Sequence, residues 1–457
     1  MDYTNTRQGR GNITPISRAP SRQAQRQTAR PQQRRNSTAQ QRRRSAASAE
    51  RPARRSKRST WLTEGGFDVP FLVIVLILVT VGIIMMLSAS YTYCYYYFDG
   101  DSFYYFKRQL VFAAVGIILM MAASRFNYEK LKRFSTLILF ISYVLLVVVL
   151  IVPPPEGFEE FHRWISLPGI GTFQPSEIAK FAIILFFAYH MDKNYIGINT
   201  KEIYEGRGAD MLSSRRGTVN LRTRTVCTIL YLLILGSTCV LVYKENHVSG
   251  TLLIFALGIM MMYLAGFPRK WFIIGIAAFI VVAVYVVTHP QVLPAHAQVR
   301  ITSWLDKDMD PLNVRWQTNH ALYAIGSGGF FGVGIGNSKM KQLYVSQPQN
   351  DFIFSIVCEE LGFVGAILIV ILFCLLVWRG FVIGIHAKDK FGSLLAMGLV
   401  FQVGLQAAIN IAVVTDVFPN TGISLPFFSY GGTSLLMLLI EMGVVLSISR
   451  TAKLKKV

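Results

Sequence analysis

The chain has little charge and lacks the patterns of several common active sites. Of its 457 residues only 16% are charged, whereas 52% are hydrophobic. This composition excludes an ordinary water-soluble globular protein and favours a membrane protein. The five cysteines give no disulfide framework, because four of them lie in apolar runs. The seven histidines lack zinc-ligand spacing, and residues 289–351 contain no Gly-x-Ser-x-Gly motif, so zinc chemistry and that covalent mechanism are disfavoured.

Positive charge is concentrated at the start of the chain. Residues 1–60 carry 15 Arg and one Lys against Asp2 and Glu50, which accounts for most of the net charge of +21. The segment has almost no large apolar residues and cannot offset its conformational entropy by burial, so it is predicted to be a disordered tail. Its arginines either attract anionic lipid head groups or act only as a topology signal. No nucleic-acid partner is predicted.

Residues 61–457 are predicted to form one membrane domain, because apolar runs of membrane length recur along them. The runs cover 70–90, 109–124, 133–152, 175–191, 226–243, 249–266, 271–288, 352–379, 393–414 and 430–449. Runs this long and this continuous predict helices rather than the strands of a barrel. The expected fold class is therefore all-α, a polytopic integral membrane bundle of about ten transmembrane helices.

Lys and Arg outside the apolar runs indicate the orientation. They gather in the tail, in 125–133, 192–225, 269–270 and 386–390, and at 453–456, all on one side of a ten-span bundle. The positive-inside rule then makes both termini cytoplasmic. The outward segments are 91–107, 153–174, 289–351 and 415–429. The longest, 289–351, is one large extracytoplasmic loop, and a connection of that length is usually functional.

This loop concentrates residues that could carry chemistry. Asp306, Asp308 and Asp310 alternate along the chain and could supply a general base or ligands for a hard cation on a pyrophosphate. The same pattern is also common in a solvated turn. The glycines between 326 and 336 resemble a phosphate cradle, but no predicted strand precedes them, so close backbone packing is favoured. Asn350 and Asp351 are predicted to cap the helix that follows.

Other ionisable residues lie inside or beside apolar runs, where an unpaired charge is costly. Glu359 and Glu360 lie about two turns inside the run that begins at 352. Glu177 and Lys180 are three residues apart on one helix face, which suits either a structural ion pair or a pair that faces a substrate. Arg163 precedes that helix and, with Lys180, could neutralise phosphate oxygens near the membrane surface.

Several segments, taken in their order, resemble the SEDS family. They are Arg163–Ile165 with Phe173–Lys180, Asp310–Pro311 with Ala324–Gly329, Asn350–Phe354 with Glu359–Gly362, and Pro426–Ser434. The resemblance runs from about 70 to 450, and Leu343–Asp351 is most similar to the FtsW type. One motif departs from the family: its usual Gln-Pro-Asp-Leu-Gly-Thr stands here as Asn246–Thr251, with His247 and Ser249 inside it.

The resemblance implies an enzyme of the bacterial cytoplasmic membrane with an extracytoplasmic active site. Members of the family polymerise lipid II, an undecaprenyl-linked disaccharide pentapeptide, into the glycan strands of peptidoglycan. They work with a class B penicillin-binding protein and other membrane proteins of the divisome or elongasome. By the same resemblance Asp310 is the catalytic aspartate, Glu177, Lys180 and Glu360 line a central cavity, and Arg163 and Lys339 are candidates for the lipid-linked pyrophosphate.

The expected reaction needs a base and neutralisation of the leaving pyrophosphate. No nucleotide cofactor is required, although a divalent cation such as Mg²⁺ or Mn²⁺ could assist the lysines and arginines. Two alternatives stay open. A lipid II flippase would account for buried charge along a transport path, and a non-catalytic divisome scaffold would account for the basic tail.

Removal of residues 2–58 tests the assignment of the tail. We expect the shortened protein to insert normally and to keep glycan polymerisation, because the tail contributes no core and the remaining loops retain the positive charge bias. Membrane fractionation and gel-resolved glycan from lipid II measure the two properties. Normal insertion with loss of polymerisation would show instead that the tail is part of the enzyme.

Overall fold

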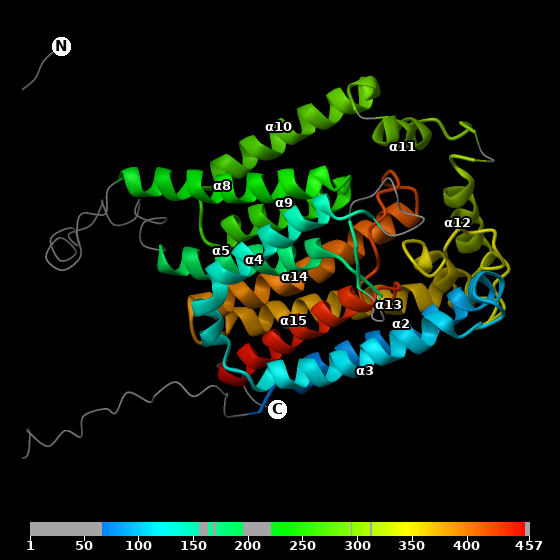
Figure 1. The fold of residues 1–457 in the computed structure, drawn as a ribbon, viewed down its shortest axis with the longest axis horizontal. Helices are drawn as coiled ribbons and strands as arrows, with labels where there is room; N and C mark the ends of the chain where they lie inside the picture. The colour runs from blue at the N-terminus through cyan, green and yellow to red at the C-terminus, as the bar shows by residue number, and fades with distance from the viewer. Residues whose placement is uncertain are drawn as a thin grey trace, which may run out of the picture. The chain divides into compact units, whose positions relative to one another are not determined.

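The computed structural model describes residues 66–154, 163–167, 171–194, 221–293, 295–310 and 313–452, and these residues are mostly helical (Figure 1). The helices are α2 (Val69–Tyr97), α3 (Tyr104–Arg125), η1 (Tyr128–Lys130), α4 (Leu131–Ile151), α5 (Pro175–Lys193), α8 (Leu221–Lys244), α9 (Val248–Leu264), α10 (Arg269–Thr288), η3 (Pro290–Val292), α11 (Ala295–Leu305), α12 (Trp316–Ser327), α13 (Ile353–Ile385), α14 (Lys390–Val414) and α15 (Gly432–Thr451). Two three-residue strands, β1 (Ile165–Leu167) and β2 (Gly171–Phe173), pair antiparallel. The predicted all-α class is confirmed. The predicted tail lies outside the described residues.

All ten predicted membrane runs are occupied by helices. By length and composition, eight helices among the described residues can cross a membrane: α2, α3, η1 with α4, α8 from Cys227 onward, α10, α13, α14 and α15. The other two runs correspond to α5 and α9. α5 carries Glu177 and Lys180 near its start, and α9 is only 17 residues long. The chain is therefore a multi-pass membrane protein.

The centre of the bundle is formed by α5, α14 and α15, most of whose side chains are buried. At the other extreme, α10 has no residue buried against the described part of the chain. Figure 1 shows α10 at the edge of the bundle, leading into α11. We call the end of the bundle that carries α11, α12 and the start of α13 the loop end.

The opposite end is tied together by two helix caps. Asp68 caps α2 by accepting from the backbone N–H of Phe71 at 3.0 Å, and it also binds Arg379 of α13 at 2.7 Å. Asp389 caps α14 and forms an ion pair with Lys132 of α4, whose ammonium nitrogen lies 2.6 Å from the carboxylate. A carboxylate at a helix start satisfies exposed N–H groups, and here each one also joins two helices.

At the loop end, α13 is broken at Gly362, whose φ of +66° is left-handed. The break leaves the carbonyl groups of Glu359 and Glu360 without donors from their own helix. Backbone N–H groups of the preceding loop replace these donors, from Val333 to Glu359 at 3.0 Å and from Gly334 to Glu360 at 3.0 Å. The loop therefore completes the backbone hydrogen bonding of α13.

The glycines of this loop allow that contact. Gly332 has a φ of +77°, and a Cβ atom there would overlap the Glu360 carbonyl oxygen. Gly336 has a φ of +87°, but open space surrounds its Cα. The prediction of close backbone packing is confirmed for Gly332 and also for Gly328, where a Cβ atom would overlap the Cys358 carbonyl oxygen, but not for Gly336.

Gly332→Ala and Gly336→Ala form a matched pair, because both positions need a left-handed backbone and only the first is crowded. Left-handed backbone costs an L-residue about 1–2 kcal/mol, and overpacking adds roughly 1–3 kcal/mol. We expect Gly332→Ala to lower the thermal unfolding temperature in detergent clearly more than Gly336→Ala does. Equal losses from both variants would show that the loop does not need close contact with α13.

Candidate functional site

The two adjacent acids of α13, Glu359 and Glu360, are both buried and accept hydrogen bonds from the glycine-rich loop. Glu359 accepts from the Ser338 hydroxyl and, at 2.9 Å, from the Lys339 backbone N–H. Glu360 accepts from the Lys341 ammonium at 2.9 Å. The carboxylate oxygen Oε2 of Glu360 has no hydrogen-bond partner among the described residues.

The Ser88 hydroxyl of α2 also holds Glu360 and its partner Lys341 in place, whereas the Lys339 side chain takes no part in this contact. The Ser88 hydroxyl of α2 donates to Glu360 at 2.7 Å and accepts from Lys341 at 2.9 Å. The side chain of Lys339, which sequence reasoning placed at the pyrophosphate, is exposed on the loop. Lys341, two residues further on, was not singled out by sequence reasoning as the partner of Glu360. The only feature of the sequence that could have suggested Lys341 is a Lys in the loop that precedes the buried acids of α13.

A second buried ion pair lies in α5, where Glu177 and Lys180 are 2.9 Å apart. The Lys180 ammonium also donates to Gln406 of α14 at 3.2 Å, and the Ser434 hydroxyl of α15 donates to Glu177 at 3.3 Å. The predicted contact between the two residues is thus present. It joins the three central helices at the ends nearer to the loop end.

A cluster of charged residues lies at the loop end, and we call it the charged cluster: Arg163, Glu245, His247, Arg300 and Asp351. Arg163 donates to the Asn246 carbonyl oxygen in the turn between α8 and α9. It interacts electrostatically with all four other members, and Arg300 of α11 interacts with Asp351 and His247. Two guanidinium groups therefore lie among two carboxyl groups and one imidazole.

Burial dominates the electrostatics of the charged cluster. It raises the pKa of Asp351 to about 6, against the opposing effect of Arg163 and Arg300. Burial also raises the pKa of Glu245 to about 8, opposed by Arg163, and it holds the pKa of His247 well below its usual value, helped by the nearby cations. Both oxygens of Glu245 lack a hydrogen-bond partner within the described residues. Near neutral pH the cluster therefore has excess positive charge, which suits an anionic ligand.

The predicted capping role of Asn350 and Asp351 is wrong. α13 begins at Ile353 after Phe352, and no side chain caps it. Asp351 faces Arg163 and Arg300 instead. Sequence reasoning singled out Arg163 but not Glu245, His247 or Arg300 as site residues, because nothing local shows that turns so distant in the chain converge.

Asp310, the predicted catalytic residue, is exposed in the turn before α12. Its φ of +39° is left-handed, and its two carboxylate oxygens accept from the Asn313 amide at 3.1 and 3.2 Å. The backbone N–H of Arg315 donates to the Asp310 carbonyl oxygen at 3.2 Å. Asp306 accepts a hydrogen bond from the backbone N–H of Asp308 at 3.1 Å. This contact is typical of an acid in a turn, the alternative role that the sequence offered for these aspartates. Pro311 lies outside the described residues.

A cavity of about 460 Å³ lies next to this turn, between α11, α12 and the segment that follows α14. Its lining comprises Val299, Arg300, Ser303, Trp304, Val314, Arg315, Thr318, Asp416 and Asn420. Arg315 binds Asp416 at 2.9 Å in the wall of the cavity and also holds the Asp310 turn. Arg300 belongs to both the cavity and the charged cluster. The exposed carboxylate, the cavity and the guanidinium groups are therefore connected at the loop end.

This arrangement can bind a polyanion and remove a proton. Guanidinium groups bind phosphate oxygens through paired hydrogen bonds, and an exposed carboxylate can act as a general base. Within the described ranges, no group of three or more His, Cys, Asp or Glu side chains could hold a metal ion.

Comparison with known proteins agrees with this picture. Residues 69–454 match the FtsW, RodA and SpoVE family, which is described as cell cycle protein. The probable peptidoglycan glycosyltransferase FtsW of Trichlorobacter lovleyi is 37% identical over 354 residues, which are 78% of this chain and 86% of the relative. The stage V sporulation protein E of Bacillus subtilis is 37% identical over 360 residues, which are 77% of this chain and 89% of the relative.

Two solved structures share the fold. One belongs to a peptidoglycan synthase complex described as coordinating polymerization and crosslinking, with a TM-score of 0.65, 23% identity, and coverage of 84% of this chain and 98% of that chain. The other is the rod shape determining protein RodA of Thermus thermophilus, with a TM-score of 0.57, 22% identity, and coverage of 85% and 98%. At these identities the likeness concerns the helical membrane bundle.

Glu245→Gln tests the electrostatics of the charged cluster. The pKa of Glu245 in the folded protein, about 8, lies above its ordinary value of 4.5, so between these values the folded form keeps a proton that the unfolded form has lost. The free energy of unfolding should therefore fall as pH rises from about 4.5 to about 8. Glu245→Gln should reduce this fall, as measured by unfolding temperature against pH, whereas Asp308→Asn should not. An unchanged pH dependence in Glu245→Gln would show that this carboxyl group is not buried as described.

Proposed function

Because the chain belongs to the FtsW, RodA and SpoVE family of cell cycle proteins, we propose that it is a peptidoglycan glycosyltransferase that polymerises lipid II into glycan strands. The observation that carries the proposal is the connection at the loop end between the exposed Asp310 turn, a cavity and the guanidinium groups of Arg163 and Arg300. A lipid-linked sugar pyrophosphate needs both a base and a cationic site. The names of the FtsW relatives support the same activity.

We place the loop end outside the cytoplasmic membrane and both termini in the cytoplasm. Many of the Lys and Arg residues that follow the tail lie at the opposite end, for example Arg125, Lys132, Lys193, Lys388 and Arg450, and the positive-inside rule makes that end cytoplasmic. Lipid II would then enter with its isoprenoid tail between helices and its sugars at the loop end.

In the proposed reaction the acceptor sugar's 4-hydroxyl oxygen forms a bond to the anomeric carbon of the donor. The bond from that carbon to the phosphate oxygen breaks, and its electron pair leaves with the lipid pyrophosphate. Asp310 accepts the hydroxyl proton and later releases it to solvent, a role worth roughly 100-fold to 10,000-fold in rate. Asn313 positions the carboxylate through the hydrogen bonds to its amide.

Arg163 is proposed to stabilise the negative charge that develops on the leaving pyrophosphate, with Arg300 beside it and Lys339 as an exposed cation on the loop. The pKa of Arg163, lowered by burial to about 10, keeps its guanidinium charged at neutral pH. A divalent cation such as Mg²⁺ or Mn²⁺ is compatible with this site if pyrophosphate oxygens supply most of its ligands.

Glu177, Lys180 and Glu360 are proposed to face the substrate from inside the bundle. Oε2 of Glu360, which has no hydrogen-bond donor among the described residues, supports this role for Glu360, since such a buried carboxylate oxygen can accept a hydrogen bond from a ligand. The Glu177–Lys180 pair would act as a polar wall near the pyrophosphate.

The proposed partner is a class B penicillin-binding protein, which would crosslink the strands, together with other divisome or elongasome membrane proteins. The fold shared with a member of a peptidoglycan synthase complex supports this assignment. Anionic lipids are the proposed partner of the basic tail.

Asp310→Asn is the decisive variant. The amide matches the carboxylate in shape but cannot accept the sugar proton, so we expect a folded, inserted protein whose glycan polymerisation is lost. The assay is gel-resolved glycan from lipid II in the presence of the partner penicillin-binding protein.

Asp306→Asn and Asp308→Asn are matched controls from the same loop, and both should keep most of the activity. Fluorescent lipid II in sealed vesicles would separate polymerisation from flipping. Near-normal product from Asp310→Asn, or equal loss from all three variants, would remove Asp310 as the base. Transport of lipid II without polymer would favour the flippase.

A further inference from the structure

A row of aromatic rings lies on α12 and the loop after it, directly beyond the Asp310 turn. The rings of Trp316 and His320 have centroids 3.9 Å apart, and those of His320 and Tyr344 are 5.8 Å apart with an angle of 16° between their planes. We call Trp316, His320 and Tyr344 the ring surface. The 5.8 Å separation means that the last two rings are offset, so part of their faces stays uncovered.

The ring surface is held in place by polar contacts with the backbone. The indole N–H of Trp316 donates to the Tyr344 carbonyl oxygen at 2.8 Å, which joins α12 to the loop. One turn along α12, His320 Nδ1 lies 2.8 Å from the Trp316 carbonyl oxygen. The amide of Gln317 donates to the Ser346 carbonyl oxygen at 2.9 Å. Ring positions fixed in this way lower the entropy cost of binding a ligand.

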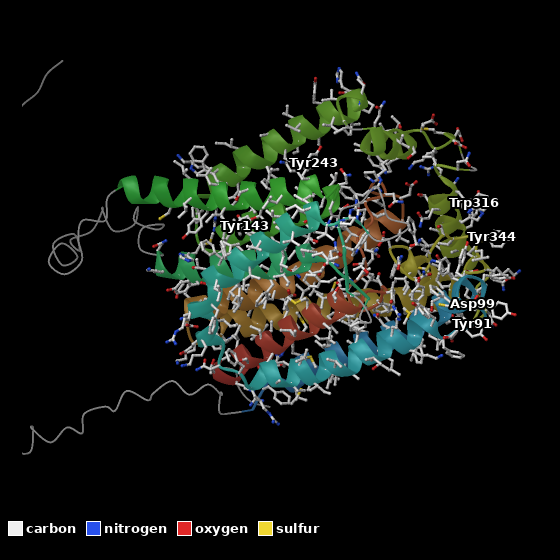
Figure 2. The ribbon with its side chains drawn as sticks, in the orientation of Figure 1. Tyr91, Asp99, Tyr143, Tyr243, Trp316 and Tyr344 are labelled. Atoms are coloured by element: carbon white, nitrogen blue, oxygen red, sulfur yellow. The ribbon has the colours of Figure 1, made fainter. Side chains whose placement is uncertain are left out.

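The ring surface is partly accessible, since Tyr344 is exposed and Trp316 and His320 are half-buried. Tyr344 is 48% exposed. Figure 2 shows Trp316 and Tyr344 together at the loop end, and Tyr243 well apart from them on α8. Trp316 directly follows Arg315, whose backbone N–H binds the Asp310 carbonyl oxygen. The ring surface therefore begins on the helix that directly follows the Asp310 turn.

We propose that the ring surface is a binding subsite for the growing glycan strand, whose N-acetylhexosamine units pack their C–H faces on the exposed Tyr344 ring and on the uncovered parts of its half-buried neighbours. The inference rests on the proposed polymerase function and names where that site would hold its polymer. Aromatic rings present a broad apolar face with little conformational entropy to lose, which suits a repeating sugar. Retention of the strand here between additions would lengthen the product.

The variants are chosen around Tyr344, because its carbonyl oxygen, not its ring, binds Trp316. Tyr344→Ala removes one ring face and leaves that backbone contact in place. Tyr344→Phe keeps the ring and serves as the rescue. Tyr243→Ala is the matched control, since that ring is 47% exposed and lies away from the ring surface.

Binding is measured by calorimetry on the full-length purified protein with a soluble octasaccharide of alternating N-acetylglucosamine and N-acetylmuramic acid. Strand length is measured on gels after polymerisation of lipid II. Tyr344→Ala should bind the octasaccharide about tenfold more weakly, as expected for one lost ring contact, and should make shorter strands. Tyr344→Phe and Tyr243→Ala should match the unaltered protein in both assays.

Unchanged octasaccharide affinity in Tyr344→Ala would overturn the proposal. Weaker association of Tyr344→Ala with the penicillin-binding protein, at unchanged octasaccharide affinity, would also overturn it and make the ring surface a protein interface. The binding assay does not depend on catalysis. The unaltered protein could bind the octasaccharide, with binding lost in Tyr344→Ala, and still not polymerise lipid II. In that case the proposed function fails and the glycan site stands.

Discussion

The structure depends on the need to pair every ionised side chain that is buried within a membrane bundle, because an uncompensated charge there is very costly. Lys341 meets Glu360 at 2.9 Å, and Lys180 meets Glu177 at the same distance. The first pair joins the loop end to α13, and the second lies where α5 contacts α14 and α15. Charge pairing thus fixes the loop end onto the apolar core.

The break in α13 shows the same constraint acting on the backbone. Gly362 interrupts the helix, and the carbonyl groups it exposes are bound by N–H groups of the glycine-rich loop. The same loop supplies Ser338 and the Lys339 backbone to the Glu359 side chain. This segment, whose glycines resemble a phosphate cradle but were predicted to serve close packing, therefore acts as a structural brace.

The loop end differs from the core because its charges are only partly compensated. Arg163 and Arg300 lie among Glu245, His247 and Asp351, and burial keeps the first of these acids and the histidine largely neutral near pH 7. Excess positive charge therefore remains beside a cavity whose wall includes Arg315, the residue that binds the Asp310 carbonyl oxygen. The interior residues hold the fold, whereas this end has unused capacity to bind an anion.

The sequence by itself determined the ten helices and the local Glu177–Lys180 contact, since hydrocarbon allows a long apolar segment few structures other than a helix, and a spacing of three residues places side chains on one face. It also indicated that the glycines serve packing. The partner of Glu360, the true surroundings of Asp351, and the meeting of Arg163 with Arg300 were decided only by the tertiary structure. These contacts join segments far apart in the chain, and helix periodicity carries no information about which helix ends become neighbours.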